Sequence, residues 1–221
     1  MTEAQLIRRV VKPAIWVAGL MPLAWLIYAF LTDRLGAEPV RGMQHFTGRT
    51  ALIILFITLS VTPLRRFTGR NALVKVRRLI GLFSFFYALL HFLIYLTFDL
   101  MFSFGDLTAD IVKRPWITVG FTVLLILTTL AITSPLAMVR RLGGKRWHAL
   151  HRLIYLAAAG GVLHFTWAQK KDIRLPLIYA AVLAVILGLR LIPRRRGGPK
   201  PAARRRPDLT EAEPLRESPP S

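Results

Sequence analysis

Histidine is the residue type whose placement in this sequence could support chemistry. The chain has five histidines, and three of them, His91, His151 and His164, fall inside strongly apolar stretches. An ionisable side chain is costly to place within an apolar segment of membrane-spanning length, so each of these three is a candidate functional residue. Neutral imidazole commonly binds metal ions and haem iron, and haem binding is therefore the first chemistry to consider.

His91 and His164 are predicted to lie at similar depth in a membrane. They belong to the third and fifth apolar stretches, roughly 18 Å and roughly 22 Å from the start of each at about 1.5 Å per residue. These two stretches run in the same direction if every apolar stretch crosses the membrane. The two imidazoles could then bind one porphyrin iron from opposite sides, an arrangement suited to electron transfer. The alternative is that each histidine only hydrogen-bonds a neighbouring helix.

Two glycines precede His164 on the same face of its predicted helix. Gly160 and Gly161 lie four and three residues before it, a spacing that places them next to the imidazole. Without side chains there, a flat macrocycle could approach the helix backbone. The alternative role of the pair is to permit tight packing between helices.

His151 belongs to a different level of the same predicted helix. It precedes His164 by thirteen positions, or roughly 20 Å along the axis, and so cannot share one iron with it. The third stretch offers Arg77 and Arg78 at the matching depth and no histidine. Haem ligand, hydrogen-bond donor to a ligand, and contact with a propionate or a quinone all remain open for His151.

The other two histidines have plainer expected roles. His148 is expected to be an exposed loop side chain. His45 is expected to be a surface residue before the second helix, with contact to a quinone head group or to a partner as the alternative. Several residues near the ends of the apolar stretches could bind haem propionates or a flavin phosphate, or could simply anchor the helices at the membrane interface; they are Arg49, Arg77, Arg78, Trp147 and Arg152.

The elements that position these residues are predicted to be membrane-spanning helices. The 221 residues are 54% hydrophobic, with a mean hydropathy of +0.47. A span needs roughly 20 mainly apolar residues, and six windows qualify: about 14–31, 48–64, 79–98, 116–133, 149–168 and 176–192. The second, fourth and sixth are the shortest. The predicted fold is an all-α polytopic bundle of about six transmembrane helices, with five as the alternative.

The formal net charge of +20 is best explained by topology. Lys and Arg cluster before the first window, between the second and third, between the fourth and fifth, and after the sixth. The intervening loops hold fewer bases, mixed with acids. This alternation follows the positive-inside rule, which predicts a multi-pass protein of the bacterial inner membrane with both termini in the cytoplasm and with the lipid bilayer, not nucleic acid, as its surroundings.

The remaining sequence limits the choice of cofactor and sets the domain boundaries. The chain has no cysteine, which excludes disulfides and Cys-bound iron–sulfur clusters. We expect a cytoplasmic N-terminus at 1–13, a haem-binding bundle at 14–192 and a disordered basic cytoplasmic tail at 193–221. The longest outer loop, 99–115, carries Phe102, Phe104 and Leu107, which favours a segment lying at the membrane surface.

Several short runs resemble those of a known family. They are QHFTGRTA at 44–51, RRLIGL at 77–82, LH at 90–91, GKRWHALH at 144–151, LHF at 163–165 and LIYA at 177–180. Their order and sequence are similar to the haem-binding membrane subunit of the periplasmic methionine-sulfoxide reductase system, within the ferric-reductase-like transmembrane superfamily. The resemblance extends over roughly residues 14–192.

The resemblance implies a function. Proteins of this kind bind b haem through histidines matching His91, His151 and His164, and they pass electrons from the respiratory quinone pool to a periplasmic molybdopterin-containing subunit that reduces methionine sulfoxide in oxidised proteins. The resemblance also admits a bound flavin mononucleotide (FMN), which no residue indicates independently. Larger members of the superfamily often have two histidine pairs, whereas the inner partner on the third helix is missing here.

Two other functions are compatible with the same residues. The first is a stand-alone cytochrome-b-type reductase acting on ferric chelates. The second is a small transporter or assembly scaffold with structural histidines. The predicted helices lack acidic residues that could relay protons and lack paired broken helices, which disfavours the second alternative.

Overall fold

The computed structural model describes residues 3–69, 72–169 and 172–192. Within these ranges every regular element is helical, which confirms the predicted all-α class. The elements are α1 (Glu3–Leu6), the π-helical turn η1 (Ile7–Val11), α2 (Lys12–Leu31), α3 (Pro39–Thr68), α4 (Ala72–Ile94), the π-helical turn η2 (Tyr95–Asp99), α5 (Phe104–Lys113), α6 (Pro115–Ile132), α7 (Leu136–Leu142), α8 (Gly144–Leu150), α9 (Leu153–Ala168) and α10 (Arg174–Leu191).

Five of the described helical segments are long and apolar enough to cross a membrane. They are Ile7–Leu31, Pro39–Thr68, Val76–Asp99, Pro115–Ile132 and Arg174–Leu191. The fifth predicted window is divided instead, because the chain turns at His151 between α8 and α9 and leaves α9 with 16 residues. At about 1.5 Å per residue α9 is roughly 24 Å long, somewhat less than the thickness of the hydrocarbon core.

The second predicted helix is much longer than the sequence suggested. It was expected to be among the shortest, yet α3 has 30 residues, begins with Pro39 in its first turn and continues through Pro63. Proline suits the first turn of a helix because its missing N–H would have no partner there. The expectation that His45 precedes the helix is therefore wrong, because His45 lies within α3.

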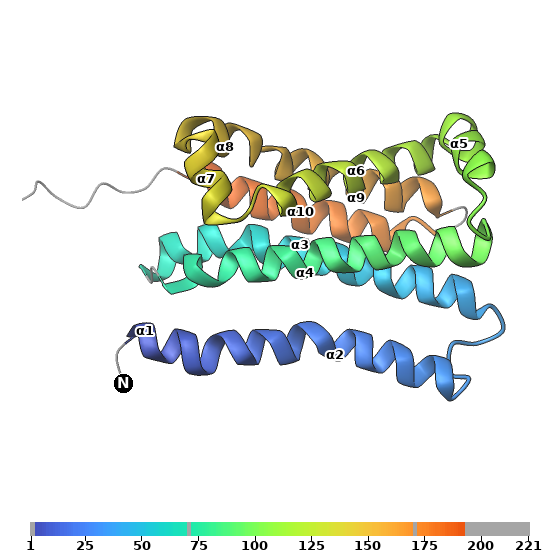
Figure 1. The fold of residues 1–221 in the computed structure, drawn as a ribbon, viewed down its shortest axis with the longest axis horizontal. Helices are drawn as coiled ribbons and strands as arrows, with labels where there is room; N and C mark the ends of the chain where they lie inside the picture. Colours follow the sequence, from blue (N-terminus) through green and yellow to red (C-terminus); the bar gives the residue numbers. More distant parts are fainter. Residues whose placement is uncertain (1–2, 70–71, 170–171, 193–221) are drawn as a thin grey trace, which may run out of the picture.

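The first helical segment also begins earlier than expected. The first predicted window starts at about residue 14, but α1 begins at Glu3 and continues through η1 into α2. Because α1, η1 and α2 follow one another directly, they form one long helical segment beside α3 and α4 (Figure 1).

A side chain from α4 enters the hydrogen-bond ladder of α2. The Tyr87 hydroxyl donates to the Gly19 carbonyl at 2.7 Å and accepts from the Leu23 N–H at 3.0 Å. An uninterrupted helix would join these two backbone groups directly, and Pro22 lies in the same turn. Tyr87 is fully buried. Its hydroxyl thus satisfies two backbone groups of α2 and links that helix to the rest of the bundle.

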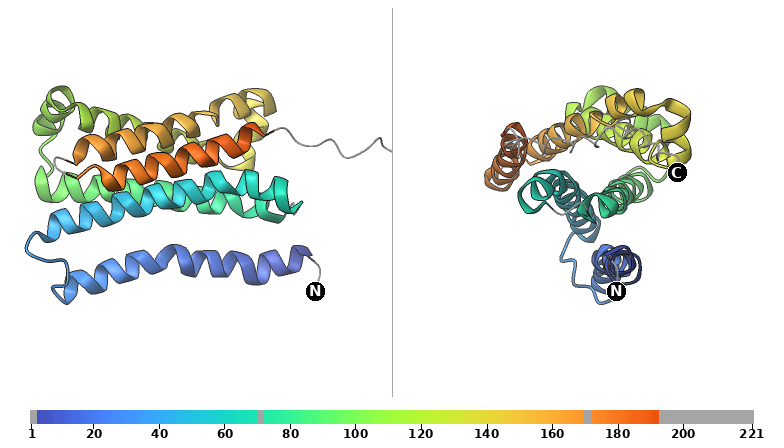
Figure 2. Two further views of the ribbon diagram at one scale, coloured as in Figure 1. Left: turned by 180° about the vertical axis from the view of Figure 1, so that it is seen from behind. Right: turned by 90° about the vertical axis from the view of Figure 1, so that its left-hand side faces the viewer.

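The main core lies between α3, α6, α9 and α10. Its buried members are Leu52, Leu55, Phe56, Leu59, Leu127, Ala157, Ala158, Val162, Leu183 and Ile186. The helices run roughly along one common axis, and the end-on view shows α3 and α4 between α2 on one side and the later helices on the other (Figure 2). The core therefore packs α9, which carries His164, against α3 and α6.

The two ends of the bundle differ in charge. The end that holds α1, α7, α8 and the last turns of α3 and α10 is called the basic end below (Figure 1). The opposite end holds the loop 32–38, α5 and the segment before α10, and is called the mixed-charge end. The first described residue of α1 and the last of α10 both lie at the basic end. The predicted tail at 193–221 falls outside the described residues.

The expected surface segment at the mixed-charge end forms a short amphipathic helix. In α5, Leu107 is buried whereas Phe104 is exposed, and the Ser103 side chain caps the helix by accepting from the Asp106 N–H. Just before it, Met101 and Phe102 adopt positive φ angles of 46° and 61°. This left-handed turn brings α5 back over the end of α4.

Candidate functional site

His91 is held by the backbone of α3. Its Nδ1 lies 3.0 Å from the Gln44 carbonyl oxygen and 3.5 Å from the Thr47 hydroxyl. A Cβ atom at Gly48 would lie 3.2 Å from the imidazole, so this glycine gives the ring room beside α3. Because a carbonyl only accepts hydrogen bonds, the Nδ1 facing it carries the proton and Nε2 keeps a free lone pair.

His164 is held in the same way by α6. Its Nδ1 lies 2.7 Å from the Trp116 carbonyl oxygen. A Cβ atom at Gly120 would lie 2.7 Å from that Nδ1, so only glycine fits next to the ring. The two histidines therefore share one design, with Nδ1–H donating to a main-chain carbonyl and Nε2 available as a ligand.

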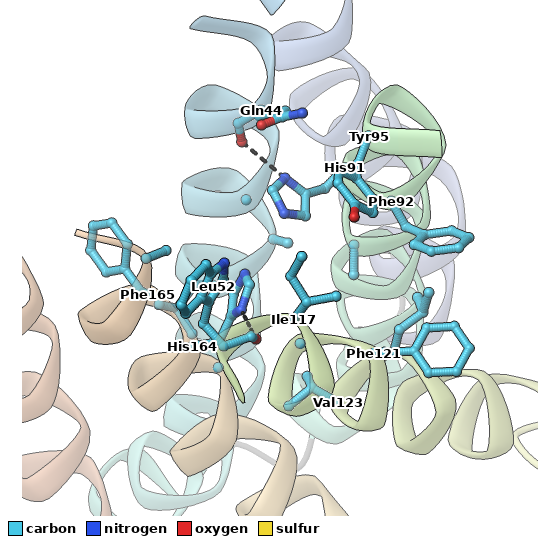
Figure 3. A pocket seen from close by; sticks show the side chains of 18 of the residues that line it. Gln44, Leu52, His91, Phe92, Tyr95, Ile117, Phe121, Val123, His164 and Phe165 are labelled. Carbon is cyan, nitrogen blue, oxygen red and sulfur yellow. Dashed lines mark hydrogen bonds between the residues drawn. The ribbon is translucent and has the colours of Figure 1, made fainter. Parts of the chain in front are cut away.

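The two imidazoles face each other across one cavity. Their ring centres are 6.1 Å apart and their planes are inclined by 78°. Figure 3 shows both rings directed into the same space from α4 and α9, each with a dashed bond to a backbone carbonyl. Two imidazoles that bind one metal ion from opposite sides, each through a bond of about 2 Å, hold their ring centres about 6 Å apart. The observed separation therefore fits a shared metal ion.

The cavity has the size and lining of a cofactor site. Its volume is about 680 Å³, which lies within the usual range for such sites. Its apolar walls come from α3, α4, α6 and α9 and include Leu52, Leu55, Phe92, Phe121, Leu124, Ala157 and Phe165. Such walls suit a flat hydrophobic macrocycle and keep water away from the two imidazoles.

Two histidines alone do not complete the coordination of an iron ion. Within the described ranges, no group of three or more His, Asp or Glu side chains is placed to hold a metal ion. A porphyrin supplies the four equatorial nitrogens itself and needs only axial ligands from the protein. The donor set of His91 and His164 thus suits haem better than a bare metal ion.

The cavity ends among charged side chains at the mixed-charge end. There the Tyr95 hydroxyl donates to the Asp110 carboxylate at 2.5 Å, and Arg114 pairs with the same carboxylate at 3.1 Å. The Gln44 side-chain amide donates to the Asp99 carboxylate. Tyr95 and Asp99 begin and end η2, and π-helical turns are frequent at functional sites.

Basic residues of α3 also line this end of the cavity. Arg41, His45 and Arg49 are spaced four residues apart and lie along one helical face. Arg41 pairs with the exposed Glu38 at 3.1 Å, and the Arg49 Nε donates to the His45 carbonyl at 3.1 Å. These side chains offer positive charge where the propionates of a haem could leave the apolar walls.

The two glycines before His164 have different surroundings. Gly161 lines the cavity, and a Cβ atom there would lie 3.2 Å from Leu52. Gly160 instead faces α6, where a Cβ atom would lie 2.7 Å from Val123. The residues that line the cavity include Gly161 but not Gly160, so Gly160 permits the close approach of α9 to α6.

His151 lies apart from this cavity, at the basic end. Its Nε2 is 3.2 Å from the Thr133 hydroxyl, and its ring stacks on Trp147 with ring centres 3.9 Å apart. The Trp147 indole N–H donates to the Thr133 carbonyl at 2.8 Å. His148 is exposed, and its ring lies edge-on to that of Trp147 with ring centres 5.1 Å apart.

Sequence reasoning missed several contributors to the site, Gly48 beside the His91 ring among them. Gln44 and Trp116 act on the histidines through main-chain carbonyls, which no pattern of side-chain types reveals. Gly120 had a weak signal, because it is a glycine in the middle of an apolar helix, but nothing in the sequence paired it with His164.

Comparison with known proteins identifies the family. Residues 14–162 match the family described as "Ferric reductase like transmembrane component". The chain belongs to this ferric-reductase-like transmembrane family, a class of multi-pass membrane proteins, in agreement with the resemblance noted in the sequence.

Individual relatives in this family are similar over most of their length. The Ralstonia nicotianae protein named "Protein-methionine-sulfoxide reductase heme-binding subunit MsrQ" is 49% identical over 185 residues, which are 83% of this chain and 85% of that protein. Proteins of the same name are 47% identical in Herminiimonas arsenicoxydans, over 82% of this chain and 84% of that protein, and in Rhodospirillum rubrum, over 88% and 95%.

Proposed function

We propose that this chain is the haem-binding, electron-carrying membrane subunit of a methionine-sulfoxide reductase system. The observation that supports this most directly is the pair formed by His91 and His164, with ring centres 6.1 Å apart across an apolar cavity and with both Nδ1 atoms held by backbone carbonyls. The names of the relatives agree with this function.

The side chains around the cavity have distinct roles in this proposal. His91 and His164 would hold the iron of b haem through Nε2, and the bound haem would supply one-electron redox chemistry. The Gln44 and Trp116 carbonyls fix the tautomer and orientation of the two rings. The apolar walls exclude water, and Gly161 lets the macrocycle approach α9.

The family resemblance implies that the histidine matching His151 also holds haem. His151 lies roughly 20 Å along the helical axis from His164, too far to share the iron. Thr133 and Trp147 hold its ring at the basic end. We propose that this residue serves a haem or another electron carrier near that end.

The proposed direction of electron flow combines the family resemblance with the topology that the positive-inside rule predicts. The basic end is placed in the cytoplasm of a bacterium and the mixed-charge end in the periplasm, with the bundle in the inner membrane and both chain termini cytoplasmic. Electrons enter from membrane quinol and leave toward a periplasmic molybdopterin-containing reductase subunit. FMN as an additional carrier rests on the family resemblance alone.

The test is reduction of the purified protein by a quinol analogue as the only electron source. A reduced-minus-oxidised spectrum of b type, with haem quantified per chain, is the expected result. When the purified catalytic subunit and methionine sulfoxide are then added, electrons should pass from the reduced protein to that subunit. Fast reduction of ferric chelates without that subunit would instead support the stand-alone ferric reductase, and absence of haem from the purified protein would contradict both.

A further inference from the structure

The basic end contains an arginine whose position depends on a proline in another helix. Pro63 has no N–H, so the Leu59 carbonyl one turn earlier on α3 lacks its usual helical partner. The Arg190 Nη2 from α10 donates to that carbonyl, and its Nη1 donates to the Tyr155 hydroxyl on α9. The guanidinium also lies over the Tyr155 ring, 5.1 Å from its centre. Arg190 thus joins α3, α9 and α10.

Two further arginines converge on the same face of α3. The Arg66 Nη1 donates to the Arg190 carbonyl at 2.6 Å, and the Arg77 Nη1 from α4 donates to the Thr62 hydroxyl at 3.3 Å. Both lie within electrostatic range of the Arg190 guanidinium. We call Arg66, Arg77 and Arg190 the arginine cluster.

The arginine cluster has no acidic partner among the residues that the structure describes. The two ion pairs found in those ranges, Arg41–Glu38 and Arg114–Asp110, both lie at the mixed-charge end. The helical segment that contains α1 and α2 lies on the other side of α3 and α4 from α10 (Figure 2). The positive charges of Arg66 and Arg77 therefore act on Arg190 with no carboxylate beside them in the described part of the chain.

The hydrogen-bonding capacity of the cluster is also largely unused. A guanidinium has five N–H donors, and the described contacts use one in Arg66, one in Arg77 and two in Arg190. The Arg190 Nε is buried and has no hydrogen-bond partner. An anion that accepts several hydrogen bonds would offset both the repulsion and the missing partner.

We propose that the arginine cluster binds the phosphate group of an anionic membrane lipid. Guanidinium groups bind phosphate oxygens in a bidentate manner, and basic sites between transmembrane helices on the cytoplasmic side suit anionic headgroups. Arg66 is exposed and Tyr155 is 38% exposed, so the site is open at the surface of the bundle, where lipid lies. The bound headgroup connects the ends of α3, α4 and α10.

The experiment measures the thermal stability of the haem-loaded protein in non-ionic detergent. Short-chain phosphatidylglycerol, phosphatidylcholine with the same chains, and inorganic phosphate are each titrated into separate samples. Phosphatidylglycerol is expected to raise the unfolding temperature saturably, whereas the other two are not. Arg66→Gln and Arg77→Gln should each weaken the apparent affinity about tenfold, and the double variant should abolish the shift.

The matched control is Arg140→Gln with Arg141→Gln, two exposed arginines of α7 at the same end, which removes the same charge. This control should keep the wild-type response, and the haem absorption spectrum shows that each variant is folded. An equal response in the cluster and control variants would refute the site, because general attraction to basic loops would then explain the binding. Full stabilisation by inorganic phosphate, or equal stabilisation by phosphatidylcholine, would refute the lipid assignment.

Discussion

Gly120 of α6 and His164 of α9 are in such close contact that a Cβ atom on the glycine would lie 2.7 Å from the imidazole Nδ1. The same ring nitrogen lies 2.7 Å from the Trp116 carbonyl oxygen, one turn earlier on α6. The position of the His164 ring is thus set by the backbone of α6 on two sides. This explains how a single histidine on a short helix can keep a fixed orientation without a polar side chain to hold it.

Gly120→Ala is expected to displace the His164 ring and to lower the haem content per chain severalfold. An added methyl group at 2.7 Å cannot be accommodated without moving the ring or the helix. Haem per chain is measured by absorption after purification. Gly188→Ala in α10 is the control, since a Cβ atom there meets nothing within 4 Å. Equal haem content in the two variants would show that the ring is not confined as described.

Tyr87→Phe is expected to destabilise the bundle by roughly 1 to 3 kcal/mol, because the Gly19 carbonyl and the Leu23 N–H would lose the hydroxyl that joins them. Denaturant titration in detergent measures this change. The haem spectrum should remain that of the wild type, since Tyr87 is not among the residues that line the cavity. Tyr28→Phe is the control, because the Tyr28 ring is half-exposed. The same loss of stability in both variants would argue against a special role for the Tyr87 hydroxyl.

His151→Ala is expected to preserve the haem bound between His91 and His164. Its ring contacts Thr133 and Trp147 and does not line the cavity, so its removal leaves both axial ligands in place. Low-spin haem per chain, compared with the wild type, measures the outcome. If the protein carries a second haem, the variant should lose that haem alone. Loss of all low-spin haem in a folded variant would mean that His151 is needed for haem binding between His91 and His164.

The sequence predicts the position of continuously apolar helices closely, but it does not predict where a helix with a polar first part begins. Hydropathy located α6 and α10 closely, because both are continuous apolar segments. The window predicted for α3 begins only at about residue 48, after a stretch that contains Gly36, Pro39 and Gly42. In the structure Pro39 begins the helix, which places Gln44 and Gly48 beside His91.

Helical depth predicts that His91 and His164 lie close together, and the structure places their ring centres 6.1 Å apart, but helical depth does not predict how the two rings are held. Matching the positions of His91 and His164 along two parallel helices requires only the helical rise, which is constant. The contacts from Gln44, Trp116 and Gly120 depend on how α3 and α6 pack against α4 and α9. Such contacts involve backbone atoms, and the choice of side chains does not encode them directly.

The measurement that tests the central proposal most directly is the electron paramagnetic resonance spectrum of the oxidised protein. The wild type should give a low-spin ferric haem signal with two imidazole ligands, and His91→Ala and His164→Ala should each lose that signal while still inserting into the membrane. His148→Ala, which changes an exposed histidine, should leave it unchanged. A full low-spin signal in either His91→Ala or His164→Ala would contradict the proposal that these two residues share one haem iron.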